Sequence, residues 1–118
     1  MTAVGKNMRI EVASSRRPEM RRFYAEALGC ELSSPMRDFD AFRFDDGFVL
    51  GAYYVEDDAA LSPQQWKRAP WIELRVEDVD AIIEALATMH ITPFEYHDPR
   101  HRYFEGPGGL VFRLTGTS

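Results

Sequence analysis

The sequence repeats itself at an interval of 62 residues, and this duplication constrains the fold more than any other feature. Residues 9–12, Arg-Ile-Glu-Val, correspond to residues 71–74, Trp-Ile-Glu-Leu. Gly47 and Gly109 are separated by the same 62 positions. Because a repeat marks one supersecondary unit, we expect the chain to build the same unit twice.

Each copy begins with alternating apolar and polar residues, at 9–12 and 71–76, as in a strand with one buried face. Apolar residues at helical spacing follow. In the first copy Ser15 is a candidate cap, Pro18 suits the first turn and Gly29 ends the helix. In the second copy Asp78 is the expected N-cap, and His90 is expected to end the helix in the left-handed conformation.

Three extended runs follow each helix, at 30–33, 39–44 and 48–55 and then at 91–96, 102–105 and 110–115. Glycine-rich turns at 45–47 and 106–109 mark the matching hairpins. The prediction is an α+β fold of two βαβββ modules in a single domain, 1–118. Module one spans about 8–55, a linker about 56–70 and module two about 71–115; Ser62-Pro63 begins a short helical turn whose Trp66 is expected over the module junction.

Size and charge limit the function classes. A chain of 118 residues with 45% hydrophobic residues is one ordinary globular domain. Its net charge of −5 disfavours nucleic acid and anionic membranes as partners. One cysteine and no apolar stretch typical of a leader or membrane span lead us to expect a cytoplasmic protein. Four arginines at 16, 17, 21 and 22 favour a solvated helix face, with an anion or dimer contact as the alternative.

Three short sequence motifs resemble those of a known family. Phe23-Tyr24 precedes Ala-Leu-Gly at 27–29, residues 76–81 read Val-Glu-Asp-Val-Asp-Ala, and residues 104–109 read Phe-Glu-Gly-Pro-Gly-Gly. Together they make the chain resemble the vicinal oxygen chelate superfamily, which includes glyoxalase I, bleomycin-resistance proteins and extradiol dioxygenases. The resemblance implies two modules around an open barrel-like cleft, helices outside the sheets, and a homodimer for so short a chain.

The same resemblance places four metal-ligand positions at Arg9, Gly51, Trp71 and Arg113. None suits a metal, because glycine has no side chain, indole is a donor only and arginine keeps its proton. We therefore expect no metal or other cofactor. A fallback metal pair is His101 with Glu105, whereas His97 and His101 as exposed loop residues are the simpler interpretation.

The remaining cleft-facing side chains predict a small-molecule binding or sequestering protein that works without metal. The expected ligand-binding residues are three arginines and two aromatic residues, Arg9, Tyr53, Trp71, Arg75 and Arg113. An excess of inward positive charge favours an anionic or zwitterionic ligand with an aromatic or apolar part. Trp66 is a further stacking candidate.

Two other function classes stay open. A glyoxalase-like lyase, isomerase or dioxygenase would use Glu11 or Glu73 as its base, or would use a divalent metal ion bound at a displaced site. An interaction protein would use its dimer surface or residues 56–70 to contact another protein. Cys30 lacks a paired histidine in the pattern and is interpreted as an inert, half-buried thiol rather than a nucleophile.

Overall fold

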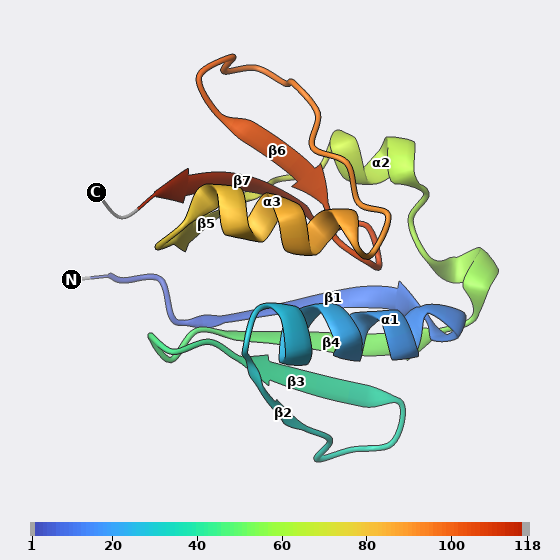
Figure 1. Ribbon diagram of the computed structural model, residues 1–118. Helices are drawn as coiled ribbons and strands as arrows, with labels where there is room; N and C mark the ends of the chain where they lie inside the picture. Colours follow the sequence, from blue (N-terminus) through green and yellow to red (C-terminus); the bar gives the residue numbers. More distant parts are fainter. Residues whose placement is uncertain (1, 117–118) are drawn as a thin grey trace. The chain divides into compact units, whose positions relative to one another are not determined.

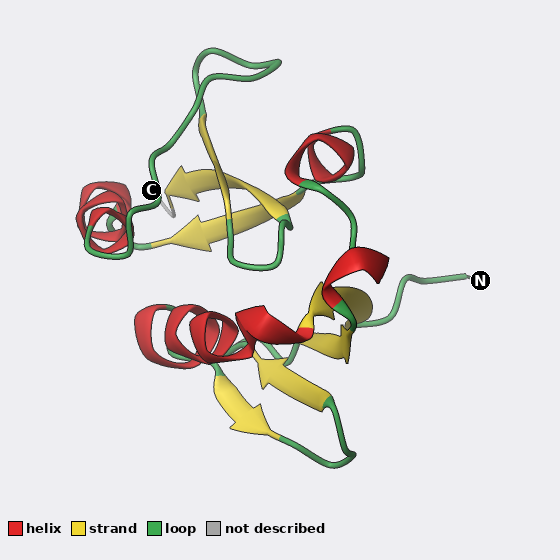
Figure 2. Cartoon of the chain, turned by 90° about the vertical axis from the view of Figure 1, so that its right-hand side faces the viewer, coloured by secondary structure: helices red, strands yellow, loops and turns green. Residues whose placement is uncertain are grey.

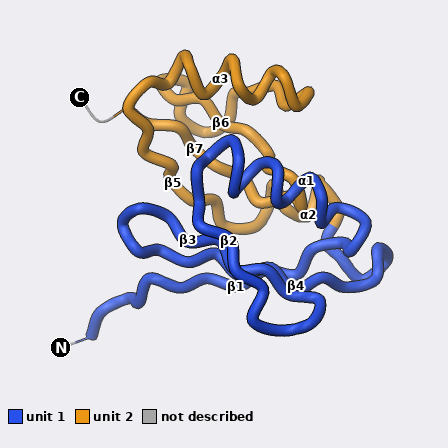
Figure 3. Tube along the Cα trace, turned by 60° about the horizontal axis from the view of Figure 1, so that its bottom comes forward, with its two compact units in different colours: residues 1–61 blue, residues 62–118 orange. Residues whose placement is uncertain are grey.

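The computed structural model describes residues 2–116, and the chain forms two compact units, Met1–Leu61 and Ser62–Ser118 (Figure 3). The boundary between them falls inside the segment 56–70 that the sequence marks as a linker. Each unit holds one copy of the repeat. None of the helices among residues 2–116 has the length and apolar character needed to cross a membrane.

Unit 1 is a four-stranded sheet with one helical segment on it (Figure 1). The elements in chain order are β1 (Asn7–Ala13), the 3-10 turn η1 (Ser14–Arg16), α1 (Arg17–Arg21), the π-helical continuation η2 (Arg22–Ala27), β2 (Glu31–Ser33), β3 (Phe39–Arg43), β4 (Val49–Val55) and the 3-10 turn η3 (Asp57–Ala59). The strand order is β1-β4-β3-β2, with β1 parallel to β4 and the other pairs antiparallel.

The helical segment buries its apolar side chains against one face of this sheet. Met20 and Phe23 are fully buried, and the Tyr24 ring lies 5.0 Å from the Phe42 ring of β3. Gly29 ends the helix as predicted, at φ +76°, a conformation that suits glycine. The expected cap at Ser15 is wrong: its side chain caps nothing, and its backbone N–H donates instead to an Asp57 carboxylate oxygen at 3.3 Å.

Unit 2 contains α2 (Pro63–Lys67), β5 (Ile72–Val76), α3 (Val79–Ala87), β6 (Arg102–Glu105) and β7 (Val111–Gly116). Its strand order is β5-β7-β6, with β5 parallel and β6 antiparallel to β7 (Figure 1). Figure 2 distinguishes the strands, in yellow, from the helices, in red. Leu86 of α3 is buried together with Leu74, Phe112 and Leu114, the helix-facing residues of the sheet.

Both helices of unit 2 begin where the sequence predicts. Ser62 and Gln65 form a reciprocal capping box at α2, and the Asp78 carboxylate accepts the Ala81 N–H at 3.1 Å. His90 has φ +61°, so its predicted left-handed conformation is confirmed. These ends are set by local side-chain and backbone chemistry, which a sequence displays directly.

The two hairpin turns show that the repeat is structural. Gly47 donates its N–H to the Phe44 carbonyl at 2.9 Å, and Gly109 donates to the Gly106 carbonyl at 3.0 Å. Phe44 in turn donates to Phe48 at 2.8 Å. The matching bond, from Gly106 to Leu110, measures 2.9 Å. Every partner in the second turn lies 62 positions after its counterpart.

The second copy departs from the first at residues 91–96. A strand was expected there, but only Phe94 pairs, through an isolated bridge to Tyr103. Pro93 immediately precedes it and has no N–H to donate to a ladder. The fold is thus the expected α+β arrangement of two βαβββ-type modules, with one strand of the second module reduced to a bridge.

Trp66 is buried, and its indole ring lies against the second hairpin turn, where a Cβ atom on Gly109 would overlap it. Its expected place over the module junction stays a prediction.

Candidate functional site

Unit 1 presents an open sheet face on the side opposite its helix. Arg9 of β1 pairs in register with Gly51 of β4, and Phe39 of β3 pairs with Tyr53 of β4. Because alternate residues of a strand point to the same face, the four lie together on this face. Two of the predicted ligand-binding residues, Arg9 and Tyr53, are thereby brought together.

The missing side chain at Gly51 makes room for Arg9. A Cβ atom at position 51 would lie 2.5 Å from the Arg9 Cδ atom and 2.8 Å from the Phe39 Cζ atom. The arginine stem therefore crosses the strand directly over the glycine.

The Arg9 guanidinium is held over two aromatic rings. Its central carbon lies 4.7 Å from the Phe39 ring centroid and 5.7 Å from that of Tyr53. Its Nη1 donates to the Tyr53 hydroxyl at 3.1 Å, and its Nε donates to the Asn7 side-chain oxygen at 3.3 Å. Among residues 2–116 the guanidinium forms no ion pair. Its two hydrogen bonds use two of its five N–H donors, which leaves three without an acceptor among these residues.

The open face of unit 2 carries a second arginine in a different state. Arg113 of β7 donates to the Glu73 carboxylate at 2.6 Å, and its guanidinium lies 4.7 Å from the Trp71 ring centroid. The hydrogen bond from Arg113 lowers the pKa of Glu73. An ionised carboxylate already engaged by a guanidinium is a poor proton acceptor, so this geometry does not favour Glu73 as a general base.

The two modules differ because their parallel strand pairs differ in register. Gly51 pairs with Arg9, whereas Arg113, the residue 62 positions after Gly51, pairs with Glu73 rather than with Trp71. The register is displaced by two residues between the copies. Glu11 accordingly pairs with Tyr53 and is not the structural equivalent of Glu73.

The other predicted charged residues stand alone. Glu11 and Arg75 are exposed and form no hydrogen bond or ion pair with the residues that the structure describes. Arg75 acts on Glu73 only through its charge, which further lowers the pKa of that carboxyl.

The four positions where the resembled family binds metal do not fit a divalent ion. Arg9 and Arg113 bring fixed positive charges, Gly51 brings no donor, and the Trp71 ring is covered by a guanidinium. The fallback pair is separated too, since four residues of extended chain place His101 and Glu105 about 13 Å apart. His101 instead lies 3.7 Å from an Asp98 carboxylate oxygen, and within residues 2–116 no three His, Cys, Asp or Glu side chains gather as metal ligands.

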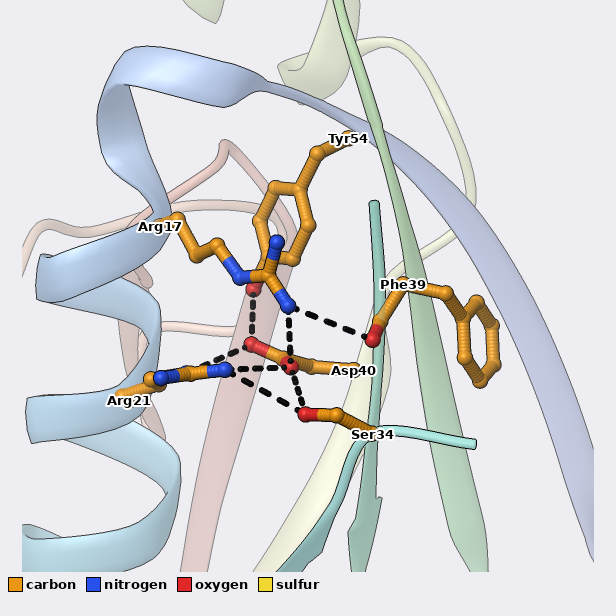
Figure 4. Close-up of polar contacts among 6 residues, drawn as sticks. All are labelled: Arg17, Arg21, Ser34, Phe39, Asp40 and Tyr54. Atoms are coloured by element: carbon orange, nitrogen blue, oxygen red, sulfur yellow. Dashed lines mark hydrogen bonds and ion pairs between the residues drawn. The ribbon is translucent and has the colours of Figure 1, made fainter. Parts of the chain in front are cut away.

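A buried ionic cluster in unit 1 escaped the sequence reasoning (Figure 4). Asp40 of β3 is fully buried under the helix, where its carboxylate accepts hydrogen bonds from Arg17 at 3.0 Å and from Arg21 at 2.9 and 3.0 Å. The Ser34 and Tyr54 hydroxyls donate at 2.6 and 2.9 Å. The predicted arginine face is therefore only partly solvated: Arg17 and Arg21 both pair with the buried Asp40, although the Arg21 side chain stays 43% exposed.

Asp40 stabilises the unit rather than offering a binding site. Burial by itself would raise its pKa, but the hydrogen bonds from its four partners outweigh burial and hold that pKa well below its usual range. Its oxygens accept five hydrogen bonds from four side chains, which leaves no capacity for a ligand. In the sequence, Asp40 is an acidic residue at a position of the strand where the pattern calls for an apolar one. This departure could have indicated the cluster.

A hollow of about 500 Å³ lies on unit 2, lined by Arg68, Ala69, Pro70, Trp71, Tyr96 and His97. Trp71 alone among these belongs to the predicted ligand-binding set. The signal that could have found the others is the aromatic Tyr96-His97 pair in the loop that replaces the expected strand.

Comparison with protein-family models and with curated proteins finds no match. Solved structures do match. A Bacillus cereus protein described as a possible glyoxalase shares 22% identity over 96% of this chain and 99% of its own, with a TM-score of 0.71. The fosfomycin resistance protein FosX of Listeria monocytogenes shares 13% identity over 99% of this chain and 93% of its own, with a TM-score of 0.73.

A third structure is TnmS3, an antibiotic binding protein from Streptomyces, at 19% identity over the full length of both chains and a TM-score of 0.59. Identities this low show the fold and no more. The chain therefore has the same fold as these glyoxalase-like, fosfomycin resistance and antibiotic binding proteins, in agreement with the fold that the sequence motifs implied.

Proposed function

We propose that this chain binds or sequesters a small anionic or zwitterionic molecule that has an aromatic or apolar part, and that it does so without a metal. The single observation that carries the proposal is the Arg9 guanidinium, held over two aromatic rings with no counter-charge among the described residues. A positioned arginine with unused donors is suited to carboxylate, phosphate or sulfonate groups.

The floor beneath Arg9 supports a ligand with a flat part. Phe39 is buried and immobilised by the sheet, while Tyr53 is 41% exposed and fixed at its hydroxyl by Arg9. Their rings lie 4.9 Å apart, so they form one apolar patch beside the cation. An anionic group on Arg9 would bring the rest of the ligand onto the Tyr53 ring.

The open face of unit 2 offers no comparable free cation at Arg113. Its guanidinium is already neutralised by Glu73 and lies over the Trp71 ring. Arg75 remains an exposed cation that adds to the positive field. Transfer of a proton by Glu73 has no support in this geometry, because its carboxylate is engaged by Arg113.

Structures of the same fold lend the proposal an analogy only. TnmS3 is an antibiotic binding protein, so this fold can host binding without a stated reaction. The FosX structures, in contrast, are those of fosfomycin resistance proteins, one of which is complexed with Mn(II). The guanidinium groups at the corresponding positions here support the first comparison over the second.

A homodimer belongs to the same proposal, because the resemblance implies that short chains of this fold pair. Light scattering should return twice the 13.6 kDa chain mass. A mass of 13.6 kDa at working concentration contradicts it.

The test is a thermal-shift panel of aromatic carboxylates, sulfonates and phosphonates, each matched with its neutral amide or alcohol. Anions should raise the unfolding temperature and neutral partners should not, because only the folded state binds them. Arg9→Gln should weaken the best anion about tenfold. Arg22→Gln, an exposed arginine on the helix, is the matched control and should leave the affinity unchanged. A panel without shifts, or an Arg9→Gln variant that binds normally, overturns the proposal.

A further inference from the structure

Two segments of the chain line the open hollow on unit 2. One wall is the segment 68–71 and the other is Tyr96 with His97, in the loop between α3 and β6. The Tyr96 hydroxyl donates to the Lys67 carbonyl at 2.7 Å, and the Lys67 ammonium lies 5.0 Å from the Phe94 ring centroid. These two contacts tie the loop to Lys67 at the end of α2, next to the segment 68–71 on the other side of the hollow.

Three of the six residues that line this hollow are aromatic. Trp71 is 37% exposed, and its ring is held by the edge of Tyr103 at 5.8 Å and by the Arg113 guanidinium at 4.7 Å. On the opposite wall the His97 ring lies 4.1 Å from the Tyr96 ring. Three rings around about 500 Å³ suit a planar group of one or two rings.

The charge of the lining is positive. Arg68 is exposed, and its guanidinium has no ion pair with any described residue. No aspartate or glutamate is among the residues that line the hollow. In a chain of net charge −5, a cation beside three aromatic rings selects an aromatic anion over a neutral or cationic ring.

We propose that this hollow is a binding site for a planar aromatic anion, such as a benzoate. The ring lies against Trp71 and the Tyr96–His97 wall, and the anionic group accepts hydrogen bonds from Arg68. The site shares no residue with Arg9, Phe39 and Tyr53, which together form the Arg9 platform, and it does not rest on that platform. The two proposals can therefore fail separately.

Tryptophan fluorescence tests the site, since the chain has two tryptophans and the other, Trp66, is buried. The probes are 4-nitrobenzoate and its neutral counterpart 4-nitrobenzamide, whose nitro-aromatic rings quench indole on contact. Saturable quenching is expected with 4-nitrobenzoate, at an affinity at least fivefold above that of the amide. Quenching that does not saturate, or equal affinities, overturns the proposal.

Variants locate the probe. Arg68→Gln should weaken 4-nitrobenzoate about fivefold and leave the amide unchanged, whereas Arg102→Gln, an exposed arginine on β6, should change neither. Trp71→Phe should remove the quenching. An unchanged affinity in Arg68→Gln overturns the proposal. Loss of affinity in Arg9→Gln but not in Arg68→Gln overturns it as well, and would support the Arg9 platform.

Discussion

A Cβ atom on Gly51 would lie 2.5 Å from the Cδ atom of Arg9, so the conformation of the arginine depends on the absence of a side chain one strand away. In register, the two residues are direct partners across β1 and β4. Any other residue at position 51 would compete with the arginine for the same space. A side chain at position 51 would therefore displace that of Arg9 from this face.

Gly51→Ala should displace the Arg9 side chain and weaken binding of the best anion from the panel about tenfold, because the guanidinium leaves the Phe39 and Tyr53 rings. Crowding against Phe39 should also cost about 1–2 kcal/mol of unfolding free energy. Titration calorimetry and urea unfolding measure the two effects. Gly5→Ala, which adds a methyl group in open space, is the control, and full affinity in Gly51→Ala would contradict this account.

Metal retention should be far below one ion per chain. Protein incubated with Ni, Zn, Fe and Mn and then dialysed should contain none of them stoichiometrically, because two guanidinium groups occupy the family's metal positions. Elemental analysis is the measurement. One bound ion per chain would contradict this prediction and would favour the enzyme hypothesis.

Asp40→Asn should destabilise the protein by about 3 kcal/mol, because it leaves Arg17 and Arg21 without the carboxylate that they jointly neutralise. Urea unfolding at pH 7 measures the change. Asp38→Asn is the matched control, since its carboxylate is largely exposed. Equal stability of the two variants would contradict the assigned role.

The pH dependence of stability should report the same carboxyl. The folded-state pKa of Asp40 lies well below its unfolded value near 4, so its contribution is complete above about pH 4 and is lost as the pH falls further. Between about pH 4 and pH 2, wild type should therefore lose stability more steeply than Asp40→Asn. Parallel curves would mean that Asp40 does not titrate as its contacts require.

Gly109→Ala should be more harmful than Gly29→Ala. Both glycines have positive φ, at +108° and +76°, but only a Cβ atom on Gly109 would overlap a neighbour, the buried Trp66 ring. Gly29→Ala should cost about 1 kcal/mol for its backbone alone, and Gly109→Ala about 2 kcal/mol more. Urea midpoints of the two variants give the difference, and equal midpoints would show that Trp66 can move aside.

Cys30 should be unreactive in the folded protein. Burial raises the pKa of its thiol to about 12, so almost no thiolate is present at pH 8. A colorimetric disulfide reagent should label less than a tenth of the thiol in native protein over minutes and one thiol per chain after denaturation. Rapid native labelling would indicate that the end of the helix opens.

Local chemistry explains what the sequence by itself determined. Some residues act only through their own backbone or their nearest neighbours, so their roles follow from residue type and spacing. These are the hairpin glycines, Gly29, His90 and the N-cap Asp78. The 62-residue repeat likewise predicts two modules of one α+β type. Only at residues 91–96 did a strand pattern fail, where Pro93 has no N–H to offer.

Tertiary structure decided which charges meet. The sequence alone predicts that Arg17 and Arg21 lie on the surface of a helix. In the fold, Asp40 of β3 lies beneath them and accepts hydrogen bonds from both. In the second module the register pairs Arg113 with the carboxylate-bearing Glu73, whereas in the first module Arg9 pairs with Gly51, which offers no carboxylate. The sequence names Arg9 and Arg113 as binding candidates, but strand register decides which residue each one pairs with, and for that reason their different charge states became visible only in the folded chain.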